Sequence, residues 1–403
     1  MKLAILGADP TTVDLARAAM ASGMHTIDWV CEIEPDSPSA GELRSVARTA
    51  RPAEQWESFL DLTLIDAVIV GRASDEDRRI EQLRKLIQVA MPVIVSHPVA
   101  DSMLIYYELD MIRREGGAIV LPYLPGRLHP AIQQLARLAS ALDSPLGKPE
   151  QLVMERLLVD RGREQVLAQF SRDVDLIRAV VGEISRIGAM GSTTEQASLA
   201  NLGVQMSGPG GILARWSVGP TAGGASARLT LSGSTGNATL NIPATGAWTL
   251  AIGGTATGGD FAAWDPARAA LDALANAIAG NEIKPDWVDA CRDVELSETI
   301  ERSLRKGRNV DLHYEEYTEE GTFKGLMTSL GCGLLMAGLA LVVVVALVEN
   351  IARALKRPIP LVDRWPYLLV GLLGVFLLMQ LFSLLFARND PKDRPGEGPP
   401  PND

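Results

Sequence analysis

A turn near the N-terminus carries residues that could hold a nucleotide. It joins an apolar run at residues 2–6 to a helical pattern at 13–20, and it consists of Gly7, Ala8, Asp9, Pro10, Thr11 and Thr12. A G-x-G-x-x-G dinucleotide turn needs its second and third glycines for close approach to the pyrophosphate and for helix packing. Only Gly7 matches, and a carboxylate at Asp9 would repel phosphates. Two interpretations stay open: Asp9 caps the helix and no cofactor binds, or NAD or NADP binds through Gly7, Ala8, Asp9, Thr11 and Thr12.

Two further polar residues follow apolar runs. Glu32 comes directly after the run 26–31, where an acidic residue in NAD enzymes holds the ribose hydroxyls, although such residues also occur on plain solvated turns. His97 follows the run 92–95 in the tripeptide Ser96-His97-Pro98. Because an imidazole exchanges protons near neutral pH, His97 is a candidate acid or base.

These residues belong to a predicted α/β domain at residues 1–121. Apolar runs predict strands at 2–6, 26–31, 66–71, 92–95 and 118–121, and helical patterns lie between them, at 75–89 and 102–114 for example. Strands that alternate with helices favour a Rossmann-like, doubly wound parallel sheet with ligands at the carboxyl ends of its strands.

A second domain is predicted at residues 122–313. It contains a helix at 130–142, a strand at 151–159, a segment at 184–252 rich in Gly, Ser and Thr, and closing helices at 265–279 and 285–305. Alternating apolar residues with tight turns predict an α+β domain on an open antiparallel sheet. The flat face of such a sheet must be covered, so a homo-oligomer through this domain is expected.

The composition narrows the class of ligand. A formal net charge of −11 over 403 residues, with scattered Lys and Arg, argues against a nucleic-acid partner and leaves small molecules as the expected ligands. Neither the three cysteines (Cys31, Cys291 and Cys332) nor the four histidines are spaced as metal ligands, so no metal site is expected.

Several segments together resemble the Gfo/Idh/MocA family, the glucose-fructose oxidoreductase and inositol dehydrogenase group of NAD(P)-dependent enzymes that act on sugars and cyclitols. The resemblance covers roughly residues 1–313. It is carried by the strand-turn-helix at 2–20, DAVIVG at 66–71, SHPVADS at 96–102, DVDLIRAVVGE at 173–183 and the closing segment 285–312. It implies a Rossmann-like domain, an α+β domain and an NAD(P) cofactor.

The catalytic positions depart from the family pattern. The family's Glu-Lys-Pro turn is Ser96-His97-Pro98 here, and its helical Asp-x-x-x-His-x-x-Asp becomes Ala168, Arg172 and Asp175. Alanine cannot titrate and Arg172 stays protonated, so Arg172 is expected to bind an anionic group instead. Asp175 is expected in the first turn of a helix. We therefore expect a catalytically degenerate module that binds a nucleotide or metabolite or serves as a scaffold. The alternative is an NAD(P)-dependent oxidoreductase of a sugar or cyclitol hydroxyl that uses His97.

The C-terminal region predicts a membrane anchor. The uncharged stretches 326–348 and 366–387 follow a linker at 314–325, and each is long enough as a helix, roughly 33–35 Å, to span a bilayer. The bilayer is thus an expected partner through residues 326–387. The absence of a signal peptide and the flanking charges place the soluble domains on the cytoplasmic side, with a loop at 349–365 and a disordered tail at 388–403.

Overall fold

The computed structural model describes residues 1–34, 37–191, 198–257 and 261–312, with the further positions 336, 342–344, 347 and 374. Residues Met1–His313 form one compact unit and Tyr314–Asp403 form another. No helix in the described part of the chain is both long enough and apolar enough to cross a membrane. Apart from those six positions, the linker, the predicted spans 326–348 and 366–387, their loop and the tail all lie outside the described residues.

The first sheet has six parallel strands in the order β3-β2-β1-β4-β5-β6. The strands are β1 (Lys2–Leu6), β2 (Thr26–Cys31), β3 (Arg51–Pro52), β4 (Ala67–Val70), β5 (Val93–Val95) and β6 (Val120–Pro122). Every residue of β4, β5 and β6 is buried, as expected for strands covered on both faces. The predicted Rossmann-like parallel sheet is confirmed.

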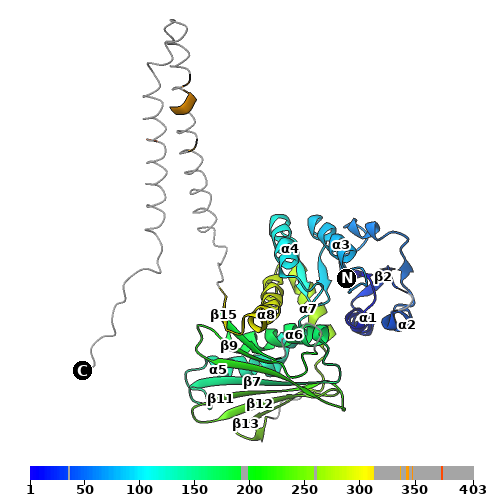
Figure 1. Ribbon diagram of the computed structural model, residues 1–403. Helices are drawn as coiled ribbons and strands as arrows, with labels where there is room; N and C mark the ends of the chain where they lie inside the picture. The colour runs from blue at the N-terminus through cyan, green and yellow to red at the C-terminus, as the bar shows by residue number, and fades with distance from the viewer. Residues whose placement is uncertain are drawn as a thin grey trace, which may run out of the picture. The chain divides into compact units, whose positions relative to one another are not determined.

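Six helices cover the two faces of this sheet (Figure 1). On one side lie α1 (Pro10–Ser22), α2 (Pro38–Val46) and α7 (Pro266–Ile278); on the other lie α3 (Glu76–Gln88), α4 (Met103–Gly116) and α8 (Trp287–Lys306). Trp287 of α8 is 1% exposed, stacks on Tyr106 at 4.9 Å and donates its indole N–H to the Tyr106 carbonyl. The two closing helices, predicted in the second domain, therefore complete the core of the first.

The second sheet has nine strands in the order β14-β13-β12-β11-β7-β10-β9-β8-β15. They are β7 (Pro149–Leu158), β8 (Arg186–Met190), β9 (Gly203–Ser207), β10 (Leu213–Pro220), β11 (Ser226–Gly233), β12 (Asn237–Ile242), β13 (Thr249–Ile252), β14 (Thr255–Ala256) and β15 (Val310–Asp311). The predicted open sheet is present and most of its neighbouring strands pair antiparallel, but the central strands β7 and β10 run parallel, so the sheet is mixed. The reason is that α6, β8 and β9 lie between these two strands in the chain and return it in the same direction.

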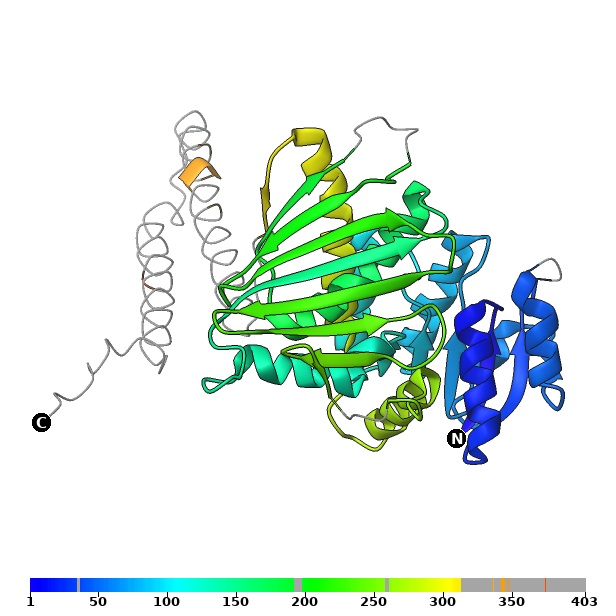
Figure 2. The same ribbon diagram turned by 90° about the horizontal axis from the view of Figure 1, so that it is seen from below.

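Only one face of the second sheet is covered by helices of the described chain. Helices α5 (Pro130–Ser140) and α6 (Arg163–Val181) lie on the covered face, whereas Figure 2 shows the other face open. The alternating residues of β11 explain this arrangement, because Ala227, Leu229 and Leu231 are buried toward the helices and Arg228 and Thr230 point away. Helix α6 thus lies between the open sheet and the first domain.

Candidate functional site

The turn after β1 is closed by its own aspartate. The Asp9 carboxylate accepts hydrogen bonds from the Thr12 backbone N–H at 2.8 Å and from the Arg72 backbone N–H at 2.9 Å. The Thr12 hydroxyl in turn accepts from the Asp9 N–H, completing a capping box at the start of α1. The predicted helix cap is confirmed. Free N–H groups make a helix N-terminus an anion site, and that of Thr12 is thereby taken up by the chain itself.

A buried arginine fills the space beneath this turn. Arg79 of α3 is 2% exposed, and its Nη2 would lie 2.8 Å from a Cβ atom at Gly7. The same nitrogen lies 3.7 Å from the Glu32 carboxylate, which also pairs with Arg78. Burial lowers the pKa of Arg79, and the Glu32 and Asp9 carboxylates oppose this shift. Glu32 is therefore already engaged by two guanidinium groups at the position where NAD enzymes need an acceptor for ribose.

These contacts decide whether an NAD(P) cofactor fits. A dinucleotide in the usual position needs free N–H groups at the start of α1 and a free acidic acceptor after β2. Here Asp9 holds the Thr12 N–H at the start of α1, and Glu32 after β2 is paired with Arg78 and Arg79. Ala8 and Thr11 lie on the same turn, and Thr11 is the second residue of α1. NAD(P) in that position would meet one donor and one acceptor that already have partners within the chain.

His97 lies at the carboxyl end of β5 and is almost fully enclosed, with 3% of its surface exposed. Its Nε2 lies 2.7 Å from the Ser171 hydroxyl of α6, and its Nδ1 lies 3.5 Å from the Tyr106 hydroxyl. Burial, with a further contribution from the Arg172 cation, lowers the pKa of His97 to about 3. The imidazole is therefore neutral at physiological pH, lacks the second ring proton that an imidazolium acid would donate, and is a weak base.

Arg172 of α6 lies beside His97, where the second domain meets the first. Its Nε donates to the His97 carbonyl at 2.9 Å, and its two terminal nitrogens have no partner among the described residues. The residue is exposed. Nearby protein atoms and the Arg72 cation both lower the pKa of Arg172. A cation that solvent can reach can bind an anion.

Asp175 does not join this group. The expectation that it begins a helix is wrong, because α6 begins at Arg163 and Asp175 lies well inside it. Its carboxylate is 1% exposed and lies 2.6 Å from Arg127 Nη2, while Arg127 Nη1 lies 2.9 Å from Asp289 of α8. Asp175 therefore joins α6 to neighbouring elements through buried ion pairs and faces no cleft.

Asp173, two residues before Asp175 on α6, holds this helix against the second sheet. Asp173 accepts hydrogen bonds from the Arg156 Nε at 2.8 Å and from the Trp216 indole N–H at 2.9 Å. Because Asp173 points to the sheet, its neighbours Ser171 and Arg172 are directed at His97 in the first domain. The sequence alone missed Ser171, Arg72 and Arg79, since each meets its partners across a long stretch of chain. The only available hint was the position of Arg72 two residues after β4.

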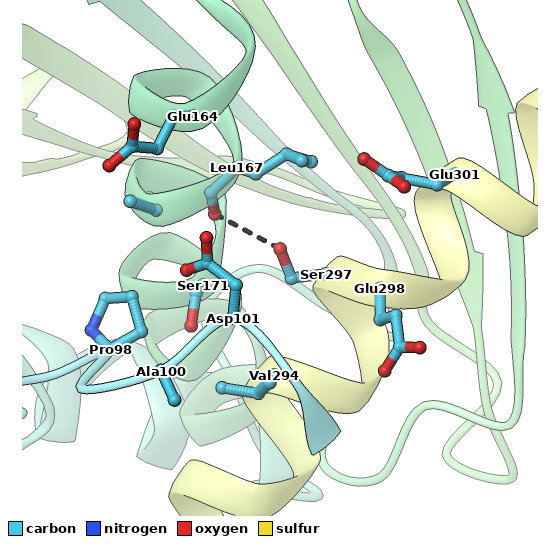
Figure 3. A pocket seen from close by; sticks show the side chains of 11 residues that line it. Pro98, Ala100, Asp101, Glu164, Leu167, Ser171, Val294, Ser297, Glu298 and Glu301 are labelled. Atoms are coloured by element: carbon cyan, nitrogen blue, oxygen red, sulfur yellow. Dashed lines mark hydrogen bonds between the residues drawn. The ribbon is translucent and has the colours of Figure 1, made fainter. Parts of the chain in front are cut away.

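A cavity of about 150 Å³ lies next to the His97–Ser171 pair. Figure 3 shows Ser171 and Asp101 close together in its lining and Ser297 donating to the Leu167 carbonyl. Four carboxylates line the cavity, from Asp101, Glu164, Glu298 and Glu301, and Ala168 lies among them. Among the residues described, no group of three or more His, Cys, Asp or Glu side chains could hold a metal ion. The cavity can therefore enclose only a small polar molecule.

The six-stranded Rossmann-like sheet and the nine-stranded mixed sheet form a two-domain architecture that several solved oxidoreductases share. Solved structures with this fold are Gfo/Idh/MocA-type oxidoreductases, among them inositol dehydrogenases. The myo-inositol dehydrogenase of Corynebacterium glutamicum is 19% identical, with a TM-score of 0.63 over 78% of this chain and 99% of that one. A putative NADPH-dependent oxidoreductase of Desulfitobacterium hafniense is 15% identical, with a TM-score of 0.65 over 77% and 97%.

A third similar structure was solved with ligands. The oxidoreductase of Agrobacterium radiobacter, in complex with NAD+, L-tartaric acid and magnesium, is 14% identical, with a TM-score of 0.61 over 77% of this chain and 98% of that one. Scans against protein-family models and curated protein sequences returned no match. At these identities the likeness shows the fold, and the chemistry must be argued from the residues of this chain.

Proposed function

We propose that this protein binds a small metabolite in the cleft between its two domains and does not transfer hydride with the family's catalytic groups. Three positions of the family machinery have changed in chemical type: the lysine is His97, the aspartate is Ala168 and the histidine is Arg172. A hydride-transfer enzyme needs a bound nicotinamide and a base beside the alcohol. Neither requirement has a suitable residue in this cleft.

The observation that carries the proposal is the Asp9 cap. Its two carboxylate oxygens hold two backbone N–H groups, so a pyrophosphate there would have to displace an internal anion that is already well bound. Charge-assisted hydrogen bonds of this kind are about twice as strong as neutral ones. A dinucleotide would therefore bind only after the cap opens.

Titration of the full-length protein with NADH and NADPH tests the proposal. The wild type is expected to show no binding up to about 1 mM cofactor. The double variant Asp9→Gly with Thr12→Gly, which restores the three-glycine turn, is expected to gain binding. Asp75→Gly serves as the control, because it removes a similar cap from α3 and leaves the turn unchanged. Sustained cofactor reduction by the wild type with any sugar or cyclitol would overturn the proposal.

An NAD(P)-dependent oxidoreductase of a sugar or cyclitol is the second candidate, and the comparisons favour it. Similar structures are dehydrogenases, and one contains NAD+ with a hydroxy acid. In this case the cofactor would lie away from the Asp9 cap, and the His97 imidazole beside Arg172 and Ser171 would act on the substrate hydroxyl. Reduction of NAD+ by myo-inositol, lost in His97→Ala and kept in His25→Ala, would support this candidate.

The membrane anchor and self-association are separate proposals. We propose that residues 326–348 and 366–387 attach the protein to a bilayer with its soluble part on the cytoplasmic side, on the strength of their uncharged composition. The open face of the second sheet supports a homo-oligomer. Recovery of the full-length protein in the membrane fraction and its mass in mild detergent test the two proposals. An aqueous, monomeric product would contradict both.

A further inference from the structure

Two arginines from different domains lie near each other, and the carboxylates paired with Arg72 are exposed and 4.0 Å away. Arg72 follows β4 in the first domain and Arg172 lies on α6 in the second. Each acts on the pKa of its surroundings as a nearby cation: Arg72 lowers the pKa of Arg172, and both lower that of His97. We propose that Arg72 and Arg172 together bind the oxyanion of a small carboxylate or phosphate ester. This inference rests on the proposed function, since it names the ligand of the same cleft.

The hydrogen bonding of the two guanidinium groups leaves room for such a ligand. Arg172 uses only its Nε, on the His97 carbonyl, and its two terminal nitrogens have no partner among the described residues. Arg72 Nη2 reaches Asp101 and Glu164 at 4.0 Å each, and both carboxylates are about two-thirds exposed. Ion pairs at that distance and exposure contribute little. An oxyanion between the two arginines would relieve their mutual repulsion and accept charge-assisted hydrogen bonds.

The place of the pair in the fold agrees with a ligand site. Arg72 comes two residues after β4, and the His97 carbonyl that fixes Arg172 comes two residues after β5. Ligands of open α/β sheets bind outside the carboxyl ends of the strands. Arg172 is held by a single directed hydrogen bond, so little side-chain entropy remains to be lost when an anion binds.

The adjoining cavity determines the size and charge of the part of the ligand beyond the oxyanion. Its volume of about 150 Å³ is lined by Ser171 and Ala168 of α6, which lie one residue and one turn before Arg172. The four carboxylates of the lining would repel a second negative charge (Figure 3). The site therefore selects a molecule with one oxyanion and a neutral or cationic polar body, such as a sugar acid or a sugar phosphate. It disfavours a molecule with an anion at both ends.

Calorimetric titration of the full-length protein in mild detergent tests this inference. The probes are D-gluconate, D-glucose 6-phosphate, neutral D-glucose and the dianion D-glucarate. We expect gluconate or the phosphate ester to bind, glucose to be undetectable, and glucarate to bind more weakly than gluconate. Arg72→Gln and Arg172→Gln should each weaken anion binding by about tenfold or more. Arg228→Gln, on the open face of the second sheet, should leave it unchanged.

The outcomes separate this inference from the proposed function. Arg172→Lys keeps a cation and should retain part of the affinity if Arg172→Gln loses it, and circular dichroism shows whether each variant folds. Anion binding that survives the double change Arg72→Gln and Arg172→Gln would overturn the inference. So would the failure of both anionic probes to bind the wild type at about 10 mM. Neither result would change the outcome of the NADH and NADPH titration, which tests the proposed function independently.

Discussion

The turn after β1 and the cleft beside β5 lie at the same edge of one parallel sheet, but they differ in whether their charged groups have partners. At the turn, Asp9 holds two backbone N–H groups, and Glu32 is paired with Arg78 and Arg79. In the cleft, Arg172 leaves two nitrogens without a partner among the described residues, and its side chain is exposed. In the first region the carboxylates are paired within the chain, and the two nitrogens of Arg79 that lack a partner there are buried. The difference teaches that a ligand is to be sought where an unpaired charge can be reached from solvent.

The cleft depends on buried ion pairs that hold α6, and breaking them should have the largest effect. Arg127→Met leaves the 1% exposed Asp175 carboxylate without its partner at 2.6 Å and should lower the free energy of unfolding by about 3–5 kcal/mol. Urea denaturation measures this loss. Adding Asp175→Leu should recover much of it. Arg186→Gln, which breaks a pair with both partners 56% exposed, should cost less than about 1 kcal/mol. Equal losses in both variants would contradict the buried network.

The buried imidazole of the cleft should make stability depend on pH. The pKa of His97 falls from 6.5 to about 3 on folding, so the unfolded chain takes up this proton first as the solution is acidified. The contribution of the neutral His97 to the free energy of unfolding is complete above pH 6.5. It is lost as the pH falls toward 3, at about 1.4 kcal/mol per pH unit. Between about pH 6 and pH 4, the wild type should lose about 3 kcal/mol more than His97→Gln.

Urea denaturation across this pH range provides the measurement. His129 is the comparison, because burial lowers its pKa to about 4. His129→Gln should therefore remove a smaller part of the pH dependence than His97→Gln does. If the His97→Gln protein shows the same slope as the wild type, the imidazole is not held neutral by burial.

The turn should respond to the loss of its cap with a moderate change. Asp9→Ala removes the acceptor of the Thr12 and Arg72 N–H groups and should lower the free energy of unfolding by about 1–2 kcal/mol. Asp9→Asn keeps one acceptor oxygen and should cost less. Thermal unfolding of both variants measures the effect. If Asp9→Ala left the free energy of unfolding unchanged, water or a ligand would be replacing the carboxylate. The two regions would then differ less than the hydrogen bonds of Asp9 indicate.

The smallest effect is expected from the carboxylates around the cleft. Glu164 lies 4.0 Å from Arg72 and is 69% exposed, so Glu164→Gln should raise gluconate affinity by no more than a few-fold. Glu301 lines the same cavity but pairs with Arg163, and Glu301→Gln should change affinity less. Calorimetric titration compares the two variants. A decrease in affinity for Glu164→Gln would place the anion somewhere other than Arg72.

Much of the fold could be predicted from local patterns. The apolar run at 2–6 and the acidic cap at Asp9 specify a strand and a helix start, and both occur where expected. The parallel pairing of β7 with β10 could not be predicted, because alternating residues define a strand's faces but not the direction of its neighbour. The same limit applies to α7 and α8, whose apolar faces do not show which sheet they cover.

The candidate site was harder to predict than the fold. The sequence identified His97 and Arg172 because they replace family residues, and the structure brings these two together. It misplaced Asp175, since a carboxylate in a helical segment can also lie inside the helix when an arginine from another element pairs with it. Arg127 does so from 48 residues away. Contacts across such separations depend on the folded topology, and no spacing rule encodes them.

The return of α7 and α8 to the first sheet has a consequence for how the chain is made. Trp287 and Leu271 belong to segments translated late, yet they complete apolar layers on opposite faces of strands translated first. The opening segments therefore leave the ribosome with both faces partly uncovered and must wait for the closing helices. During that interval they are exposed to aggregation, and a chain halted before the closing helices would present the same uncovered surfaces to chaperones and proteases.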